Sequence, residues 1–158
     1  MILHIKITYD GAEATVGQRR LREINRTALG TGMRFMHQEL LPGHFEPGAS
    51  ERYDYAPRSE HYKRRKPRYA REIALVRSGR GKREILAMPH IQAFPTRATM
   101  TLSAPSYFRM MPAPGQPDMA AEVFTVLPEE KTRIEIVMGK TVVAELRKRG
   151  IQKTVVVG

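Results

Sequence analysis

The 158-residue sequence contains no cysteine and no tryptophan, and only 7% of its residues are aromatic. Without cysteine there can be no disulfide and no thiolate metal site. No apolar run approaches the roughly 20 residues that span a bilayer, and the N-terminus lacks the pattern of a signal peptide, so we expect a soluble protein. The core must depend on aliphatic side chains and on nine methionines, which adapt to irregular packing.

Motifs that carry catalysis are missing as well. Residues 78–82 superficially resemble a phosphate-binding loop, but Val76 stands where that loop needs glycine and Arg83 where it needs serine or threonine. No two histidines have the helical spacing of a metal site; His37 and His44 are seven residues apart. No serine lies in a nucleophile elbow. We therefore expect no enzyme, no catalytic residue, no metal and no cofactor.

Positive charge dominates the chain and is unevenly distributed. The formal net charge is +11. Residues 1–51 contain six basic and six acidic side chains, whereas residues 52–83 contain twelve basic and three acidic ones. The remaining residues contain nine basic and seven acidic ones. A basic block of this kind indicates a surface that binds nucleic acid or an acidic protein.

Two long helices are expected. Residues 16–41 place apolar side chains at helical spacing after a candidate capping box at residues 15–18. Gly30 and Gly32 weaken this helix by about 1 kcal/mol each relative to alanine, and they could mark a bend or a close approach of another backbone. Residues 128–149 begin with proline and two glutamates and end with basic residues, which suits both ends of a helix.

Between the helices, the pattern predicts short strands around an aperiodic segment. Residues 43–70 have no clear period and contain three prolines, so we expect an extended basic arm or loop that is either disordered or held by something else. A short helix or strand pair is expected within residues 71–88. The fold class that follows is α+β, a single domain over residues 1–158 with a small, mostly antiparallel sheet. The expected strands are residues 2–9, 94–104, 107–111, 120–126 and 151–157.

The arm carries the candidate binding residues. Basic side chains can neutralise phosphates or dock on acidic protein neighbours, and the tyrosines around them, Tyr53 and Tyr55 included, could stack on bases. A solvated charge run with no partner is the alternative. The expected partner-binding residues are Arg52, Arg58, Tyr62, Lys63, Arg64, Arg65, Lys66, Arg68, Tyr69 and Arg71.

This order of elements resembles the small neck or tail-completion proteins of long-tailed bacteriophages. The resemblance rests on the long helix, on the basic run at residues 62–66, on the apolar-to-glycine turn at residues 75–80, on Tyr107, and on the helix that opens at Pro128. It extends diffusely over about residues 15–149, without an invariant signature.

The resemblance implies a structural virion protein that assembles in the host cytoplasm. It would form a six- or twelve-fold homo-oligomeric ring at the head–tail junction, joining the portal-side connector to the tail. Its partners would be neighbouring connector and tail proteins, with nonspecific DNA contact in the channel left open. The alternative from another class is an RNA-binding protein, such as a ribosomal or ribonucleoprotein component, which shares the basic extension and the pI near 10.3.

Overall fold

The computed structural model describes residues 2–6, 17–76, 78–108 and 116–149, and these form a mixed helical and β structure. Three strands make a small sheet in the order β1–β3–β2. β1 is Ile2–Lys6, β2 is His90–Ala93 and β3 is Arg97–Thr101. A tight turn joins β2 to β3, closed by a hydrogen bond of 2.8 Å from the Phe94 amide to the Arg97 carbonyl, so these two strands are antiparallel. The expected α+β class is confirmed at this level.

The chain groups into two compact units. We call the described residues within His37–Pro89 and Thr101–Leu127 the central unit, and the described residues within Ile2–Met36, His90–Met100 and 128–149 the helix–sheet unit. Neither unit is a continuous stretch of sequence. Side chains that are close in the chain therefore need not belong to the same folded surface.

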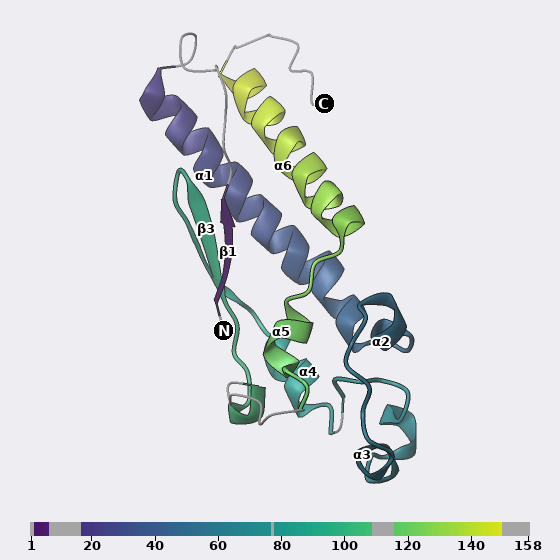
Figure 1. The fold of residues 1–158 in the computed structure, drawn as a ribbon. Coiled ribbons are helices and arrows are strands. Elements are labelled where there is room, and N and C mark those ends of the chain that lie inside the picture. The colour runs from purple at the N-terminus through teal and green to yellow at the C-terminus, as the bar shows by residue number, and fades with distance from the viewer. Residues whose placement is uncertain (1, 7–16, 77, 109–115, 150–158) are drawn as a thin grey trace. The chain divides into compact units, whose positions relative to one another are not determined.

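In the helix–sheet unit, α1 (Gln18–Phe35) packs against both β2 and α6 (Pro128–Lys148). Figure 1 shows α1 and α6 running side by side. Ile24 and Ala28 of α1, four residues apart, are fully buried, as are Leu29 and Met33. Ile134 and Met138 are buried on α6, and Ala98 and Met100 alternate with less buried residues along β3. Both expected helices and the strand within residues 94–104 are confirmed.

Gly32 allows the close approach of α1 and α6. A Cβ atom at this position would lie 2.6 Å from the sulfur of Met138 and 3.3 Å from Cγ2 of Ile134. At Gly30 the nearest neighbour of a Cβ would be the Ala93 side chain, at 3.5 Å. The glycines therefore mark contacts with neighbouring side chains rather than with another backbone.

The helical segment that begins at Gln18 continues past residue 41, the expected end of the helix, but it changes type. A π-helix covers Met36–Leu40 and a 3-10 helix covers Leu41–Phe45. Pro42 lies in the first turn of the 3-10 helix. The candidate capping box is not formed: α1 starts at Gln18 after Gly17, without a side-chain cap, and Thr15 lies outside the described residues.

The central unit is built from short helices around buried Phe45, Ile85, Phe108 and Val123. Short helical segments also occupy much of residues 43–70, where an extended arm was expected; whether this segment reaches a neighbouring subunit stays a prediction. The segments of this unit after Phe45 are α2 (Ala49–Arg52), α3 (Glu60–Arg64), η3 (Arg68–Ala70), α4 (Arg80–Ile85), η4 (Ser106–Phe108) and α5 (Met119–Val123).

Two expected strands are wrong in the described residues. Residues 120–126 contain α5, because the Asp118 carboxylate caps this helix by accepting hydrogen bonds of 3.0 Å from the amides of Ala120 and Ala121. In the range 107–111, Ser106–Phe108 forms a 3-10 turn closed by the Phe108 amide on the Pro105 carbonyl at 3.0 Å, and residues 109–111 lie outside the described residues. The expected strand at residues 151–157 lies outside them too.

Candidate docking surface

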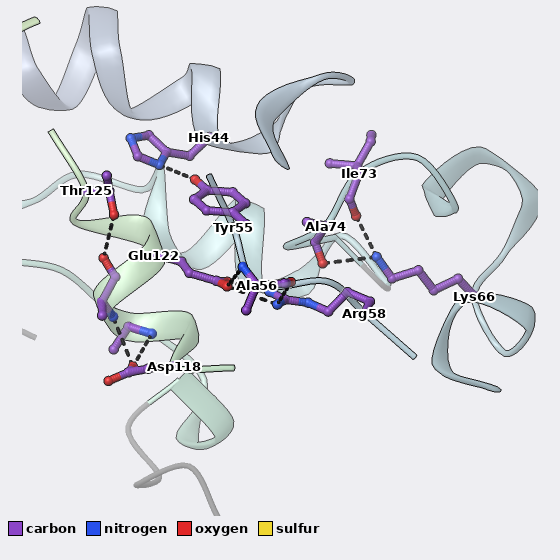
Figure 2. Close-up of polar contacts among 12 residues, drawn as sticks. His44, Tyr55, Ala56, Arg58, Lys66, Ile73, Ala74, Asp118, Glu122 and Thr125 are labelled. Carbon is purple, nitrogen blue, oxygen red and sulfur yellow. Dashed lines mark hydrogen bonds and ion pairs between the residues drawn. The ribbon is translucent and has the colours of Figure 1, made fainter. Parts of the chain in front are cut away.

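Arg58, one of the expected partner-binding residues, lies inside the central unit. Its guanidinium forms a two-pronged ion pair with Glu122 of α5, and both side chains are about nine-tenths buried. One guanidinium nitrogen also donates to the Ala56 carbonyl at 2.8 Å, and the Ala56 amide donates to Glu122 at 3.2 Å. Figure 2 shows these contacts converging on the Glu122 carboxylate. The ion pair thus fastens the segment before α3 to α5.

Lys66 is a second internal anchor. Its side chain is buried, and its ammonium donates to the carbonyls of Ile73 and Ala74 at 2.6 and 3.0 Å (Figure 2). The ammonium also lies 5.0 Å from the centre of the Tyr62 ring. Burial, and to a smaller degree the positive charge of Arg58, lowers the pKa of Lys66 to about 8. Lys66 therefore ties residues 73–74, which follow η3, to the segment between α3 and η3.

Two of the tyrosines considered for base stacking belong to the core. His44, Tyr53 and Tyr55 form a buried stack, in which the His44 and Tyr53 ring centres are 3.9 Å apart. Nδ1 of His44 is hydrogen-bonded to the Tyr55 hydroxyl (Figure 2). Tyr53 and Tyr55 cannot offer a free ring face to a base. Tyr62 is half-buried, whereas Tyr69 is 68% exposed.

The exposed residues of the expected site gather on and around α3. Ser59 caps this helix by accepting a hydrogen bond of 3.2 Å from the Tyr62 amide, and Lys63 pairs with Glu60 at 2.8 Å. Arg52 is exposed at the end of α2, with its guanidinium 5.2 Å from the centre of the Tyr53 ring. The other exposed residues of the expected set are Lys63, Arg64, Arg65, Arg68, Tyr69 and Arg71.

An open groove of about 670 Å³ lies beside α3. Three of its lining residues are basic, Lys63, Arg64 and Arg71, and the same groove contains three glutamates. The mixture of charges suits a protein surface that offers both acidic and basic side chains, because glutamates would repel a run of phosphates. The sequence alone could not show that Glu51, Glu60 and Glu72 share one groove with the basic run.

The glycine-containing turn at residues 78–82 has a packing role. Gly79 has φ of 75° and precedes α4, a backbone conformation that favours glycine. Gly81 is buried in α4, and a Cβ there would lie 2.8 Å from both the Phe108 ring and the Tyr107 hydroxyl. The turn therefore serves aromatic packing, and it offers no cradle for a phosphate at Gly81.

The histidines and carboxylates of the described residues do not form a metal site. Nε2 of His37 is 3.3 Å from the Ile85 carbonyl, so this histidine, like His44, has a hydrogen-bond partner in the core. Within residues 2–6, 17–76, 78–108 and 116–149, no three histidine or carboxylate side chains are placed to hold a metal ion. None of the described helices is long and apolar enough to cross a bilayer.

Comparison with known protein families found no matching family, and comparisons with curated proteins and with solved structures found no match.

Proposed function

We propose that this protein is a structural virion component, a ring-forming protein of the bacteriophage head–tail junction that docks on its neighbours through the exposed surface around α3. The observation that carries the docking role is the open groove whose walls combine Lys63, Arg64 and Arg71 with glutamates. We call the exposed residues Lys63, Arg64, Arg65, Arg68, Tyr69 and Arg71, together with this groove, the docking surface.

The two internal anchors support this role. A segment that must order only when it binds loses conformational entropy at that moment. Here the buried Arg58–Glu122 pair and the buried Lys66 fix the segments on either side of α3. The docking surface is thus held in position before a partner arrives, which lowers the entropic cost of association.

The ring assignment rests on the resemblance described above and on the charge of the docking surface. Subunits of a closed ring repeat the same pair of complementary surfaces around the axis. An acidic patch on the next subunit, or on an adjoining connector or tail protein, would be the complement of the basic side of the groove. No catalytic role is part of this proposal.

Charge reversal at the docking surface tests the proposal. The triple variant Lys63→Glu, Arg64→Glu and Arg65→Glu changes the charge by six units and leaves the buried Lys66 in place. Because all three side chains are exposed, we expect the fold to survive, as measured by circular dichroism and thermal melting. We expect assembly of joined heads and tails to fail when the variant replaces the parent protein in phage production.

A matched control carries the same charge change on α6: Lys131→Glu, Lys140→Glu and Arg147→Glu, all exposed. The control should still yield joined particles. Normal assembly by the docking-surface variant would refute the proposal. If the variant instead loses RNA that co-purifies with the parent, with no effect on particles, the RNA-binding alternative replaces it.

A further inference from the structure

Positive charge is concentrated in residues 52–83 along the sequence, but it is divided differently between the two folded units. The described parts of the central unit contain eleven basic and nine acidic residues, so they are close to balance. The described parts of the helix–sheet unit contain thirteen basic and five acidic residues. The stronger positive surface is therefore expected on the helix–sheet unit, although residues 1–51 contain equal numbers of basic and acidic side chains.

A second groove lies on this unit, between α1 and the turn that joins β2 to β3. It has a volume of about 580 Å³. The α1 side contributes Arg19, Arg22 and Arg26, which share one face of the helix because they are three and four residues apart. At a rise of 1.5 Å per residue the three arginines extend over about 10 Å. That length is about three times the axial rise of about 3.4 Å between phosphates of one strand in a duplex, so the row is long enough to reach more than one phosphate.

Few acidic side chains of the protein neutralise the charge of these arginines. Arg22 and Arg26 form no ion pair with a described residue, and Arg19 is 3.8 Å from Glu23 with a side chain that is almost fully exposed. Glu23 is the one carboxylate of the groove lining, and Arg149 also approaches it, at 3.5 Å. The first turn of α1 contains no acidic residue, so the positive end of the helix dipole adds to the same potential.

The opposite side of the groove is apolar and aromatic. Ala93, Phe94 and Pro95 line it, and Phe94 is 42% exposed. The guanidinium of Arg97 lies 5.2 Å from the centre of the Phe94 ring. Together, the groove offers arginines for phosphates on one side and an aromatic ring on the other, the combination by which single-stranded nucleic acids are bound.

We propose that this groove, formed by Arg19, Arg22, Arg26, Phe94 and Pro95, binds single-stranded nucleic acid. The arginines contact successive phosphates, and Phe94 stacks on an unpaired base. Arginine suits this role because its planar guanidinium can make two parallel hydrogen bonds to one phosphate. An acidic peptide is the less suitable ligand, since it would not use the exposed ring as a stacking platform. The proposal uses none of the residues of the docking surface.

Fluorescence anisotropy with the full-length protein tests the proposal. The probes are a labelled dT12 oligonucleotide and a labelled 12-base-pair duplex, each titrated at several salt concentrations. The double variant Arg22→Gln and Arg26→Gln removes two phosphate contacts. Because each contact contributes about 0.7 to the salt slope for a single strand, the slope should fall by about 1.4. The control variant Lys140→Gln and Arg147→Gln loses the same charge from α6 and should keep the parent slope.

The variant Phe94→Ala separates stacking from charge. It should weaken binding of dT12 about fivefold or more, the lower end of measured base–aromatic stacking, and leave duplex binding unchanged. If Phe94→Ala weakens binding of both probes equally, or weakens binding of neither, the stacking role of Phe94 is overturned. Identical salt slopes for the Arg22/Arg26 variant and the α6 control would overturn the groove as the binding site.

Two further measurements test which ligand binds and where it binds. Polyglutamate at matched charge should not displace dT12; displacement would overturn the assignment to nucleic acid in favour of an acidic polypeptide. The docking-surface variant Lys63→Glu, Arg64→Glu and Arg65→Glu should bind dT12 like the parent. If that variant alone loses dT12 binding, the nucleic-acid site lies around α3 and the α1 groove is refuted.

Discussion

Gly30 and Gly32 lie two residues apart in α1, and we expect alanine to have opposite effects at the two positions. In the interior of a helix, alanine is more favourable than glycine by about 0.8–1 kcal/mol. At Gly30 the added Cβ would make an ordinary contact of 3.5 Å with Ala93. Gly30→Ala should therefore stabilise the protein by about 1 kcal/mol, which corresponds to a rise in Tm of about 2–4 °C for a chain of this size.

At Gly32 the cost of packing the added Cβ exceeds the gain in helix propensity from alanine. The Cβ would lie 2.6 Å from Sδ and 2.8 Å from Cγ of Met138, and 3.3 Å from Cγ2 of Ile134. Met138 and Ile134 are both buried, and the branched Ile134 side chain has little rotameric freedom. Forcing extra volume into a packed core costs about 1–3 kcal/mol. We expect Gly32→Ala to be destabilising by about 1 kcal/mol net.

Urea unfolding of both variants and a double-mutant cycle with Met138→Ala would check this reasoning. Met138→Ala alone should cost about 2–5 kcal/mol, because it truncates a buried side chain. In that background Gly32→Ala should become stabilising, giving a coupling energy of about 2 kcal/mol. The reasoning is wrong if Gly32→Ala stabilises the parent as Gly30→Ala does, or if the cycle shows no coupling.

The two internal anchors give further predictions. Lys66 has a lower pKa in the folded protein than in the unfolded chain, so the unfolded chain binds more protons between about pH 8 and 10.5, and stability should rise with pH in that window. The variant Lys66→Met should lack this rise in urea unfolding at pH 7, 8, 9 and 10; a parallel rise in both proteins would exclude Lys66 as its cause. Glu122→Gln leaves the Arg58 guanidinium buried without its counter-charge and should cost about 3–5 kcal/mol. The double variant Arg58→Met and Glu122→Leu should recover most of that loss in thermal melting, and failure to recover would show that the hydrogen bonds to Ala56 matter more than the charge.

The long helices could be predicted because periodicity and end signals agree over many residues. In α6, proline and glutamates begin the helix, basic residues end it, and Ile134 and Met138 form the buried face. The alternation of Ala98 and Met100 likewise predicted β3. These signals are local, so one sequence window contains all the information needed.

The short elements could not be predicted in the same way. A strand is expected over residues 120–126, yet the capping carboxylate of Asp118 starts a helix there. Such a choice depends on one side chain and on burial of Glu122 against Arg58, a residue far away in the sequence. A window of a few residues contains neither fact.

The candidate site illustrates the same limit. A run of basic residues at 63–68 looked uniform in the sequence, but Lys66 is 3% exposed while its neighbours Arg64 and Arg65 face solvent. Lys66 lies beyond the end of α3, so the period of that helix does not set it apart from its neighbours. Its burial depends on the carbonyls of Ile73 and Ala74, which a run of basic residues does not reveal. The arginines of α1 were passed over because six acidic residues balance the first 51 residues in a count along the chain.

The two grooves differ in their charges, so we expect them to differ in specificity and in salt dependence. Around α3, acidic and basic side chains share one groove, so specificity for a complementary protein surface can come from both attraction and repulsion. On α1, arginines with little compensation face an exposed ring, so a flexible polyanion can bind in many registers. Added salt should therefore weaken binding at the α1 groove steeply, through release of counterions from the phosphates, and binding at the α3 surface less, because a protein partner has no phosphate backbone with condensed counterions. The two grooves are made of different residues, so each can be altered without changing the other.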